Sequence, residues 1–256
     1  MATTYLSRTF GTDNSAVYKW TYSFWVKRGL ISETGSTPSI EEVVTNAYVD
    51  NNTLGIVRFN TDNTLEIYDY QSGYKLRKIT NRKFRDCSAY YNIVISNDNS
   101  VASPVFNLYI NGVEETSFST DTNYTQNQAT MFDKNVLNEI GRISNGSGYF
   151  SGLISHAQFV DGAALGPTEF GEVDATSGIW KIKTACYATP GDNGFCLKME
   201  TTTGSAMGTD SSGEGNNFTE YGSPTQAIDN PSNVMATLNP LDDYYSAGTF
   251  SNGNTT

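Results

Sequence analysis

Carboxylates, one histidine and three cysteines are the side chains of this 256-residue chain that could take part in chemistry. Glu41 and Glu42 are adjacent in sequence, as are Glu114 and Glu115, and both pairs fall in segments typical of extended chain. Because successive side chains of a strand point to opposite faces, neither pair can direct both carboxylates at one bond. We expect these four residues to be solvated surface charges, and the sequence predicts no catalytic residue.

His156 is the only histidine. It lies in a long predicted strand, Tyr149–Val160, where strict alternation would place it on one face with Ile154, Gln158 and Val160. A single histidine cannot supply a multi-histidine zinc or iron site. A Ser-His-Asp arrangement depends on partners that sequence distance does not reveal. We therefore expect a histidine on the sheet surface or at an interface.

Three side chains at alternate positions resemble the start of a calcium-binding loop. Asp210, Ser212 and Glu214 offer oxygen atoms, and Gly215 follows them. The twelfth position of such a loop, which supplies a bidentate glutamate, is Tyr221 here. We therefore expect no metal site and no other cofactor. If calcium does bind, these three residues are the candidate ligands, and a polar loop without a metal is the alternative.

The cysteines Cys87, Cys186 and Cys196 are odd in number and form no Cys-x-x-Cys motif, which argues against zinc. Cys186 and Cys196 flank the turn sequence PGDNG at residues 190–194, so they could face each other across a hairpin. In a chain made in a reducing compartment, however, both are expected to be free thiols packed as small apolar groups. A disulfide between them is the alternative.

The composition excludes several classes of protein. Only 17% of residues are charged and the net charge is −11, so no basic surface for nucleic acid is expected, and an anionic membrane would repel the chain. No apolar stretch reaches the length of a transmembrane helix, and the N-terminus lacks a hydrophobic signal region. We therefore expect no membrane insertion and synthesis in a cytoplasm. Aromatic residues, at 12%, argue against a disordered chain.

Apolar residues recur with a period of two, which predicts strands, and turn sequences separate them. Asn111-Gly112, for example, is a strong hairpin signal between Val105–Ile110 and Val113–Phe118. One short helix is expected after Leu165, with Gly166 as N-cap and Pro167 at the first position. The other predicted strands are Tyr18–Val26, Leu54–Phe59, Leu65–Tyr70, Tyr91–Ser96, Leu137–Arg142, Tyr149–Val160 and Phe195–Met199.

This pattern predicts an all-β antiparallel β-sandwich over residues 1–200. From about residue 201 the chain becomes rich in Gly, Ser, Thr and Asn. Residues 201–256 are expected to form an extended C-terminal segment, packed on the domain or leading away from it as a linker.

Three of these segments together resemble the concanavalin A-like, or laminin-G-like, jelly roll: YSFWVK at 22–27, YYNIV at 90–94 and LYING at 108–112. Three later segments are similar to a subgroup found in virion proteins of marine and cyanobacterial tailed phages. They are residues 159–172, 178–183 and 193–198. The resemblance covers nearly the whole chain and keeps the family's order.

Some proteins of this fold hydrolyse glucans with a strand of the form Glu-x-Asp-x-x-Glu. The nearest match here is Glu172, Asp174 and Ser177, which lacks the third acid and falls in a segment predicted as a loop. The resemblance therefore implies a non-enzymatic virion structural protein, either a tail fibre or a capsid appendage or decoration. A stand-alone lectin is the alternative, and a glycan hydrolase is a remote one.

The expected role is adhesion to host-surface glycan or docking to other virion proteins, and the expected location is the virion. A homotrimer is one possible assembly, since closed symmetry is the rule for oligomers.

Overall fold

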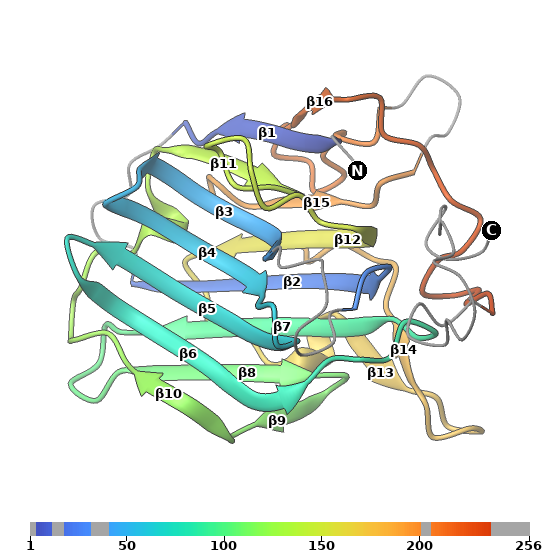
Figure 1. The fold of residues 1–256 in the computed structure, drawn as a ribbon, viewed down its shortest axis with the longest axis horizontal. Helices are drawn as coiled ribbons and strands as arrows, with labels where there is room; N and C mark the ends of the chain where they lie inside the picture. The colour runs from blue at the N-terminus through green and yellow to red at the C-terminus, as the bar shows by residue number, and fades with distance from the viewer. Residues whose placement is uncertain (1–3, 12–17, 32–40, 201–205, 237–256) are drawn as a thin grey trace.

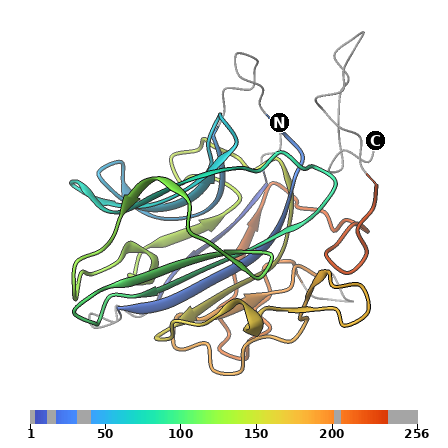
Figure 2. The same ribbon diagram turned by 90° about the horizontal axis from the view of Figure 1, so that it is seen from below.

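The computed structural model describes residues 4–11, 18–31, 41–200 and 206–236. They form two packed antiparallel sheets and a separate two-stranded ribbon, as the two views show (Figures 1 and 2). The only helical elements among these residues are two 3-10 turns. This arrangement confirms the predicted all-β antiparallel sandwich of the concanavalin A-like jelly-roll type.

The larger sheet has eight strands in the order β10-β6-β5-β4-β3-β11-β1-β16, and it lies nearer the viewer in Figure 1. The second sheet has six strands in the order β15-β12-β2-β7-β8-β9. The ribbon of β13 and β14 lies outside the six-stranded sheet (Figure 2). The strands are β1 Tyr5–Thr9, β2 Lys19–Arg28, β3 Glu42–Asp50, β4 Thr53–Phe59, β5 Thr64–Gln71, β6 Tyr74–Lys83, β7 Tyr91–Asp98, β8 Val105–Ile110, β9 Val113–Glu115, β10 Phe118–Thr122, β11 Leu137–Ile140, β12 Gly152–Asp161, β13 Gly171–Val173, β14 Trp180–Ile182, β15 Phe195–Leu197 and β16 Thr219–Tyr221.

The main core fills the space between the two sheets. Alternation along β2 sends Trp20, Tyr22 and Phe24 into it, all at most 1% exposed. The opposite face of β2 is covered as well, because Trp180 and Ile182 of the β14 strand pack on Trp25. The six-stranded sheet is therefore buried on both faces around β2.

The predicted short helix is a single 3-10 turn, Pro167–Glu169, with Gly166 at its N-cap. Pro167 sits at the first position, where its missing N–H removes no hydrogen bond. The second 3-10 turn, Met131–Asp133, lies against β3, β4 and β5 and is buried.

The described part of the predicted C-terminal extension packs on the sandwich. Strand β16 pairs with β1 at the edge of the eight-stranded sheet. Further along, Asp229 accepts a hydrogen bond from Lys27 Nζ at 2.7 Å, and the two side chains are 2% and 0% exposed. Residues 201–205 and 237–256 of that extension lie outside the described residues. The boundary at residue 200 stays a prediction.

Glu42 is not the solvated surface charge that the sequence predicted. It is 1% exposed, and its Oε2 accepts hydrogen bonds from Arg28 Nε and Nη2 at 3.0 and 2.7 Å. Alternation does send Glu41 and Glu42 to different sides, but one of those sides is the interior. Glu41 is exposed and pairs with Arg58. Glu114 is exposed as predicted, and Glu115 is half-buried.

Candidate functional site

Four tyrosines gather on the outer face of the eight-stranded sheet. Strand register makes Tyr48, Leu54, Tyr70 and Tyr74 successive cross-strand neighbours on β3, β4, β5 and β6. Tyr68 lies two residues before Tyr70 and so shares its face. Leu54 and Tyr68 belong to an apolar cluster separate from the main core, which shows that this face points outward. We call Tyr48, Tyr68, Tyr70 and Tyr74 the tyrosine face.

Three rings of the tyrosine face contact one another. Tyr74 meets Tyr68 and Tyr70 edge to face, with ring centroids 5.7 and 5.1 Å apart. Tyr74 is 44% exposed, whereas Tyr48 and Tyr70 are half-buried and Tyr68 is 9% exposed. Rigid aromatic rings of partial exposure offer apolar area at a low cost in side-chain entropy, which suits a binding surface.

Guanidinium groups frame these rings. Arg77 lies 4.4 Å from the centre of the Tyr74 ring, and Arg58 lies 5.2 Å from that of Tyr68. Both arginines donate hydrogen bonds to the buried carboxylate of Glu66, at 2.7 to 2.9 Å. The face therefore combines aromatic surface with fixed polar groups, and its one buried carboxylate is fully engaged.

Two carboxyl groups have a pKa raised by burial, as a general acid would need, but both lie in the interior. Burial raises the pKa of Glu42 despite the adjacent Arg28 guanidinium. Burial also raises the pKa of Asp69, which is 0% exposed. Asp69 accepts hydrogen bonds from Met131 N at 2.7 Å and from Tyr124 Oη at 2.9 Å. Neither carboxyl group can reach a ligand in this fold.

The acidic motif at Glu172 and Asp174 is engaged by a lysine and by the turn that follows it. Glu172 lies in strand β13, so the prediction of a loop was wrong there, because Gly171–Val173 pair with β14. Asp174 accepts hydrogen bonds from the backbone N–H groups of Ser177 and Thr176, which lower its pKa to about 2. Lys181 lies 3.2 Å from Glu172 and 3.4 Å from Asp174. These acids stabilise the β13–β14 turn.

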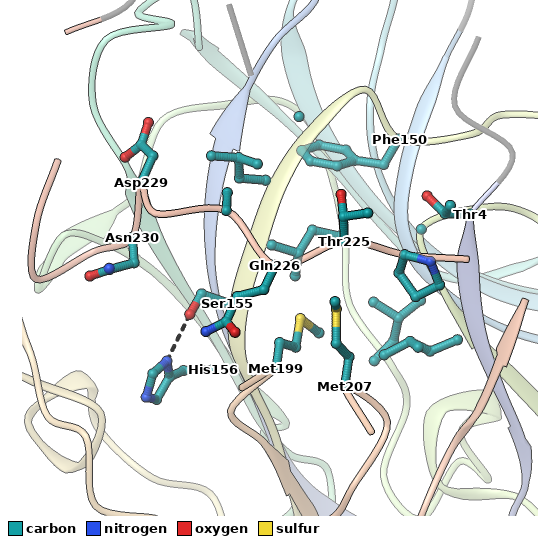
Figure 3. A pocket seen from close by; sticks show the side chains of 18 of the residues that line it. Thr4, Phe150, Ser155, His156, Met199, Met207, Thr225, Gln226, Asp229 and Asn230 are labelled. Atoms are coloured by element: carbon teal, nitrogen blue, oxygen red, sulfur yellow. Dashed lines mark hydrogen bonds between the residues drawn. The ribbon is translucent and has the colours of Figure 1, made fainter. Parts of the chain in front are cut away.

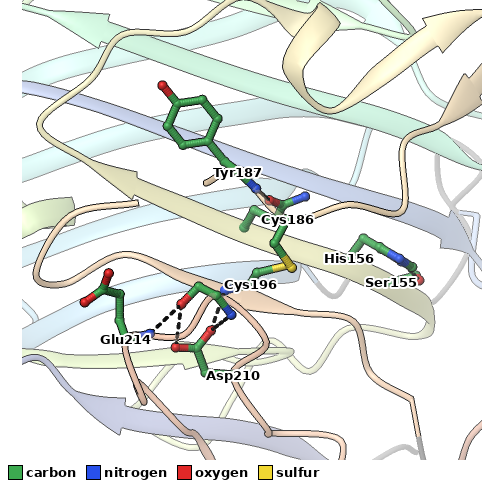
Figure 4. Close-up of a disulfide and its surroundings, with 9 residues drawn as sticks. Ser155, His156, Cys186, Tyr187, Cys196, Asp210 and Glu214 are labelled. Atoms are coloured by element: carbon green, nitrogen blue, oxygen red, sulfur yellow. Dashed lines mark hydrogen bonds between the residues drawn. A yellow bond between two sulfur atoms is a disulfide. The ribbon is translucent and has the colours of Figure 1, made fainter. Parts of the chain in front are cut away.

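Of the three calcium candidates, Asp210 and Ser212 are in contact, but Asp210 already has protein partners (Figure 4). Its Oδ1 accepts from Cys196 N and Ser212 N, both at 2.9 Å. Its Oδ2 accepts from Ser212 Oγ at 2.7 Å and Asn216 N at 2.8 Å. Glu214 is exposed, and its carboxylate is directed away from Asp210. Calcium binding was only the alternative to the expected absence of a metal site and stays untested, and it would require Asp210 to give up some of these bonds.

In the described residues, no group of three or more histidine, cysteine, aspartate or glutamate side chains is placed to hold a metal ion.

Cys186 and Cys196 form a disulfide, so the prediction of two free thiols was wrong (Figure 4). The sulfur atoms are 2.10 Å apart and the Cα atoms 5.8 Å apart. The turn at residues 190–194 closes with a hydrogen bond from Gly194 N to Gly191 O at 2.9 Å and brings the two cysteines together. The prediction relied on a reducing compartment, whereas the local turn determines that the two cysteines meet. Cys87 is buried and takes no part in the bridge.

His156 is buried, at 8% exposed, so the expected position on the sheet surface was wrong, and the alternative of an interface stays untested. The pairing of β12 with β2 shifts between Ser155 and Gln158, and His156 has φ of +46° within this bulge. Ile154 therefore pairs with Val26 on the core side, whereas Gln158 pairs with Ser23 on the other. The predicted common face for Ile154, His156 and Gln158 was wrong because strict alternation fails at a bulge.

The environment of His156 keeps its imidazole neutral. Ser155 Oγ lies 2.8 Å from Nδ1, and Nε2 is screened from water with no hydrogen-bond partner in the described residues. Burial lowers the pKa of His156 to about 4, with Glu200 raising it and Lys198 lowering it to smaller extents.

The tyrosine face was not predicted as a unit. Tyr68 and Tyr70 fell in a predicted strand at a spacing of two, which was a usable signal for a shared face. Tyr48 and Tyr74 lie in strands that the periodicity did not reveal, so their position beside the other two needed the sheet register.

Residues 3–169 match the family model described as the concanavalin A-like lectin/glucanases superfamily. The chain belongs to this superfamily.

Two solved structures are similar at low identity. One is a native heptameric SAP-like pentraxin from Limulus polyphemus, with 15% identity and a TM-score of 0.41 over 65% of this chain and 80% of that one. The other is the CBM40 of the Ruminococcus gnavus IT-sialidase, solved with α2,3-sialyllactose. It shows 11% identity and a TM-score of 0.39 over 64% of this chain and 90% of that one. No curated protein sequence matches this chain. None of the described helical elements is long and apolar enough to span a membrane.

Proposed function

We propose that this protein is a non-enzymatic glycan-binding component of a phage virion, which attaches the particle to host-surface carbohydrate through the tyrosine face. The observation that carries the proposal is the cluster of partly exposed rings framed by arginines on the rigid eight-stranded sheet. Aromatic rings stack on the apolar faces of sugars, and fixed polar groups bond their hydroxyls. Superfamily membership supports this choice of ligand.

The state of the carboxylates supports binding without hydrolysis. A glycosidase needs two accessible acids about 5 to 9.5 Å apart across the scissile bond. On the tyrosine face, Glu66 is held by two arginines. Nearby on the same sheet, Glu139 is held by Arg142 through two hydrogen bonds of 2.9 Å. The carboxyls with raised pKa, Glu42 and Asp69, are buried.

The virion assignment rests on the resemblance of residues 159–172, 178–183 and 193–198 to phage virion proteins. The Cys186–Cys196 disulfide fits a protein that works outside a reducing cytoplasm. Tail fibre and capsid appendage or decoration are both compatible with this role, and docking to other virion proteins would accompany either. A homotrimer of this chain would present three tyrosine faces and raise avidity without new contacts.

A binding assay on immobilised host polysaccharide tests the proposal. The double variant Tyr70→Ala/Tyr74→Ala removes two rings worth about 0.5–1.5 kcal/mol each, so affinity should fall by about 5- to 150-fold. Tyr221→Ala is the matched control, because Tyr221 is also 44% exposed but stacks on Tyr5 at the far edge of the sheet. Unchanged affinity in a folded double variant would reject the tyrosine face.

Particle association tests the virion role separately. The protein should sediment with intact particles, and no reducing ends should appear when it is incubated with the bound polysaccharide. Glycan binding without particle association would instead establish the stand-alone lectin. Release of reducing sugar would establish the hydrolase.

A further inference from the structure

A cavity of about 700 Å³ lies at the edge of the sandwich, away from the tyrosine face (Figure 3). Its walls come from the start of β12, the chain that follows β15, and the C-terminal segment 223–232. No residue of the tyrosine face lines it. Its volume is within the range of cavities that bind small molecules, about 300–1,000 Å³.

One part of the cavity wall is apolar. Phe150 and Met207 are 6% and 8% exposed, and Met199, which lies beside Met207 in Figure 3, packs against the main core. Methionine side chains adapt their shape to small apolar groups, so this corner suits a methyl or short alkyl group.

The opposite part of the wall carries uncharged hydrogen-bonding groups. Ser155, Gln226 and Asn230 line it, and Figure 3 shows all three on the same side of the cavity, whereas Thr225 lies beside Phe150. Hydroxyls and carboxamides both donate and accept hydrogen bonds. This wall therefore suits a ligand group that has a donor and an acceptor close together.

The cavity offers little for a charged ligand. The carboxylate of Asp229 accepts hydrogen bonds from Lys27 Nζ at 2.7 Å and from Met235 N at 3.2 Å, so its charge is already neutralised. Lys198 and Glu200 also line the cavity, and their charges are of opposite sign. An uncharged ligand fits these surroundings better than an ion.

The wall formed by residues 223–232 is fixed in position. Besides the buried pair with Lys27, Tyr90 Oη donates a hydrogen bond to the backbone oxygen of Asp229 at 2.9 Å. The site is thus preorganised, which reduces the entropy cost of binding.

His156 lies at one end of this cavity (Figure 3). Its Nε2 has no partner in the described residues, and such a buried group costs free energy. Its Nδ1 contacts Ser155, which also lines the cavity, so a ligand group beside Ser155 would change the surroundings of the imidazole. The Ser155 hydroxyl can donate to Nδ1 or accept from it, so Nε2 can serve as either acceptor or donor.

We infer that this cavity binds an acetamido group, with its methyl group against Phe150, Met199 and Met207 and its amide beside Ser155 and His156. The acetamido group unites a small apolar end with an adjacent N–H and C=O and carries no charge. An N-acetylated sugar and an N-acetylated peptide both present it. The inference stands independently of the tyrosine face.

The single histidine makes the test direct, because the imidazole signals of His156 in an NMR spectrum need no assignment. The whole chain is titrated with methyl N-acetyl-β-D-glucosaminide, with N-acetylalanine methylamide, and with methyl β-D-glucoside as the ligand without an acetamido group. We expect a saturable shift of the imidazole signals with at least one acetamido ligand and none with the glucoside. A response to the sugar alone or to the peptide alone identifies the source, and a response to both makes the acetamido group sufficient.

Two variants guard the interpretation. Ala227→Phe places a larger side chain in the cavity wall and should abolish the shift. Tyr70→Ala/Tyr74→Ala lies outside the cavity and should leave the shift intact, so failure of this inference and failure of the tyrosine face can be told apart. The inference is overturned if no acetamido ligand shifts the signals at tens of millimolar, or if the glucoside shifts them equally. Should Ala227→Phe not fold, the wild-type ligand comparison alone decides.

Discussion

The buried imidazole of His156 predicts a specific dependence of stability on pH. Its pKa falls from 6.5 to about 4 because burial disfavours the charged form. The unfolded chain therefore takes up a proton below pH 6.5 that the folded chain refuses until about pH 4. Since the unfolded state binds more protons in this window, the free energy of unfolding falls as the pH falls.

The magnitude follows from the shift in pKa. One pKa unit corresponds to 1.36 kcal/mol, so the difference between 6.5 and about 4 corresponds to about 3 kcal/mol. Above pH 6.5 the imidazole contributes no slope, and below about pH 4 its full cost has been incurred. The carboxyl groups also titrate in this window, so the contribution of His156 has to be isolated by comparison with a variant.

His156→Asn is the appropriate variant, because asparagine does not titrate and tolerates the positive φ of +46° at this position. Urea unfolding of both proteins between pH 4 and 7.5 gives the two free-energy curves. We expect the stability of the wild type relative to the variant to fall by about 3 kcal/mol between pH 6.5 and 4. Parallel curves across this window, or a pKa near 6.5 for the single histidine by NMR, would refute the reasoning.

Three other changes should have measurable effects. Cys186→Ser removes the Cys186–Cys196 disulfide and should lower the free energy of unfolding by about 2–4 kcal/mol in urea without reductant. A reductant should lower the stability of the wild type to that of the variant. Equal urea midpoints without reductant would contradict the bridge. Lys27→Met leaves Asp229 buried without its cation and should cost about 3–5 kcal/mol of unfolding free energy, whereas Lys27→Met/Asp229→Leu should recover much of that loss. The unfolding free energies of the wild type, the two single variants and the double variant test this, and additive losses would count against the ion pair. Gly112→Ala would place a Cβ 2.5 Å from the Trp180 ring at a φ of +78°, so it should lower the melting temperature clearly. Gly213→Ala, also at positive φ but in open space, is the control and should lower the melting temperature less. Thermal melting curves of the two variants test this.

Strand patterns were readable where one face met the core and a turn signal set the register. Val105–Ile110 was predicted with its observed bounds, since Asn111 and Gly112 adopt the positive φ values of 51° and 78° that the hairpin requires. Strand β6 was not predicted, because Tyr74–Lys83 carries few apolar residues and its pairing with β5 is interrupted by two register shifts. In β3, the adjacent residues Val43 and Val44 are both buried, in clusters on opposite faces of the sheet, so the sequence shows no single apolar face there.

The candidate sites were harder to predict than the fold, because each depends on contacts between residues that are distant in the sequence. His156 lies at a bulge, Glu42 finds its cation Arg28 across the interior, and Asp210 accepts its hydrogen bonds from residues up to 14 positions away. None of these partners follows from local periodicity. Residue type limited the possible chemistry, but the long-range pairing decided which groups are buried, engaged or accessible.

The two candidate sites differ in what holds them in place. The tyrosine face rests on β3–β6, whose ladder hydrogen bonds and interlocked rings fix it before any ligand binds. The cavity depends on segment 223–232, in which Asp229 lies 202 residues from Lys27 in sequence and forms a buried ion pair with it. A change at Lys27 should therefore affect the cavity and leave the tyrosine face intact. That separation is the basis for assigning the two surfaces independent roles, one toward extended glycan and one toward a small uncharged group.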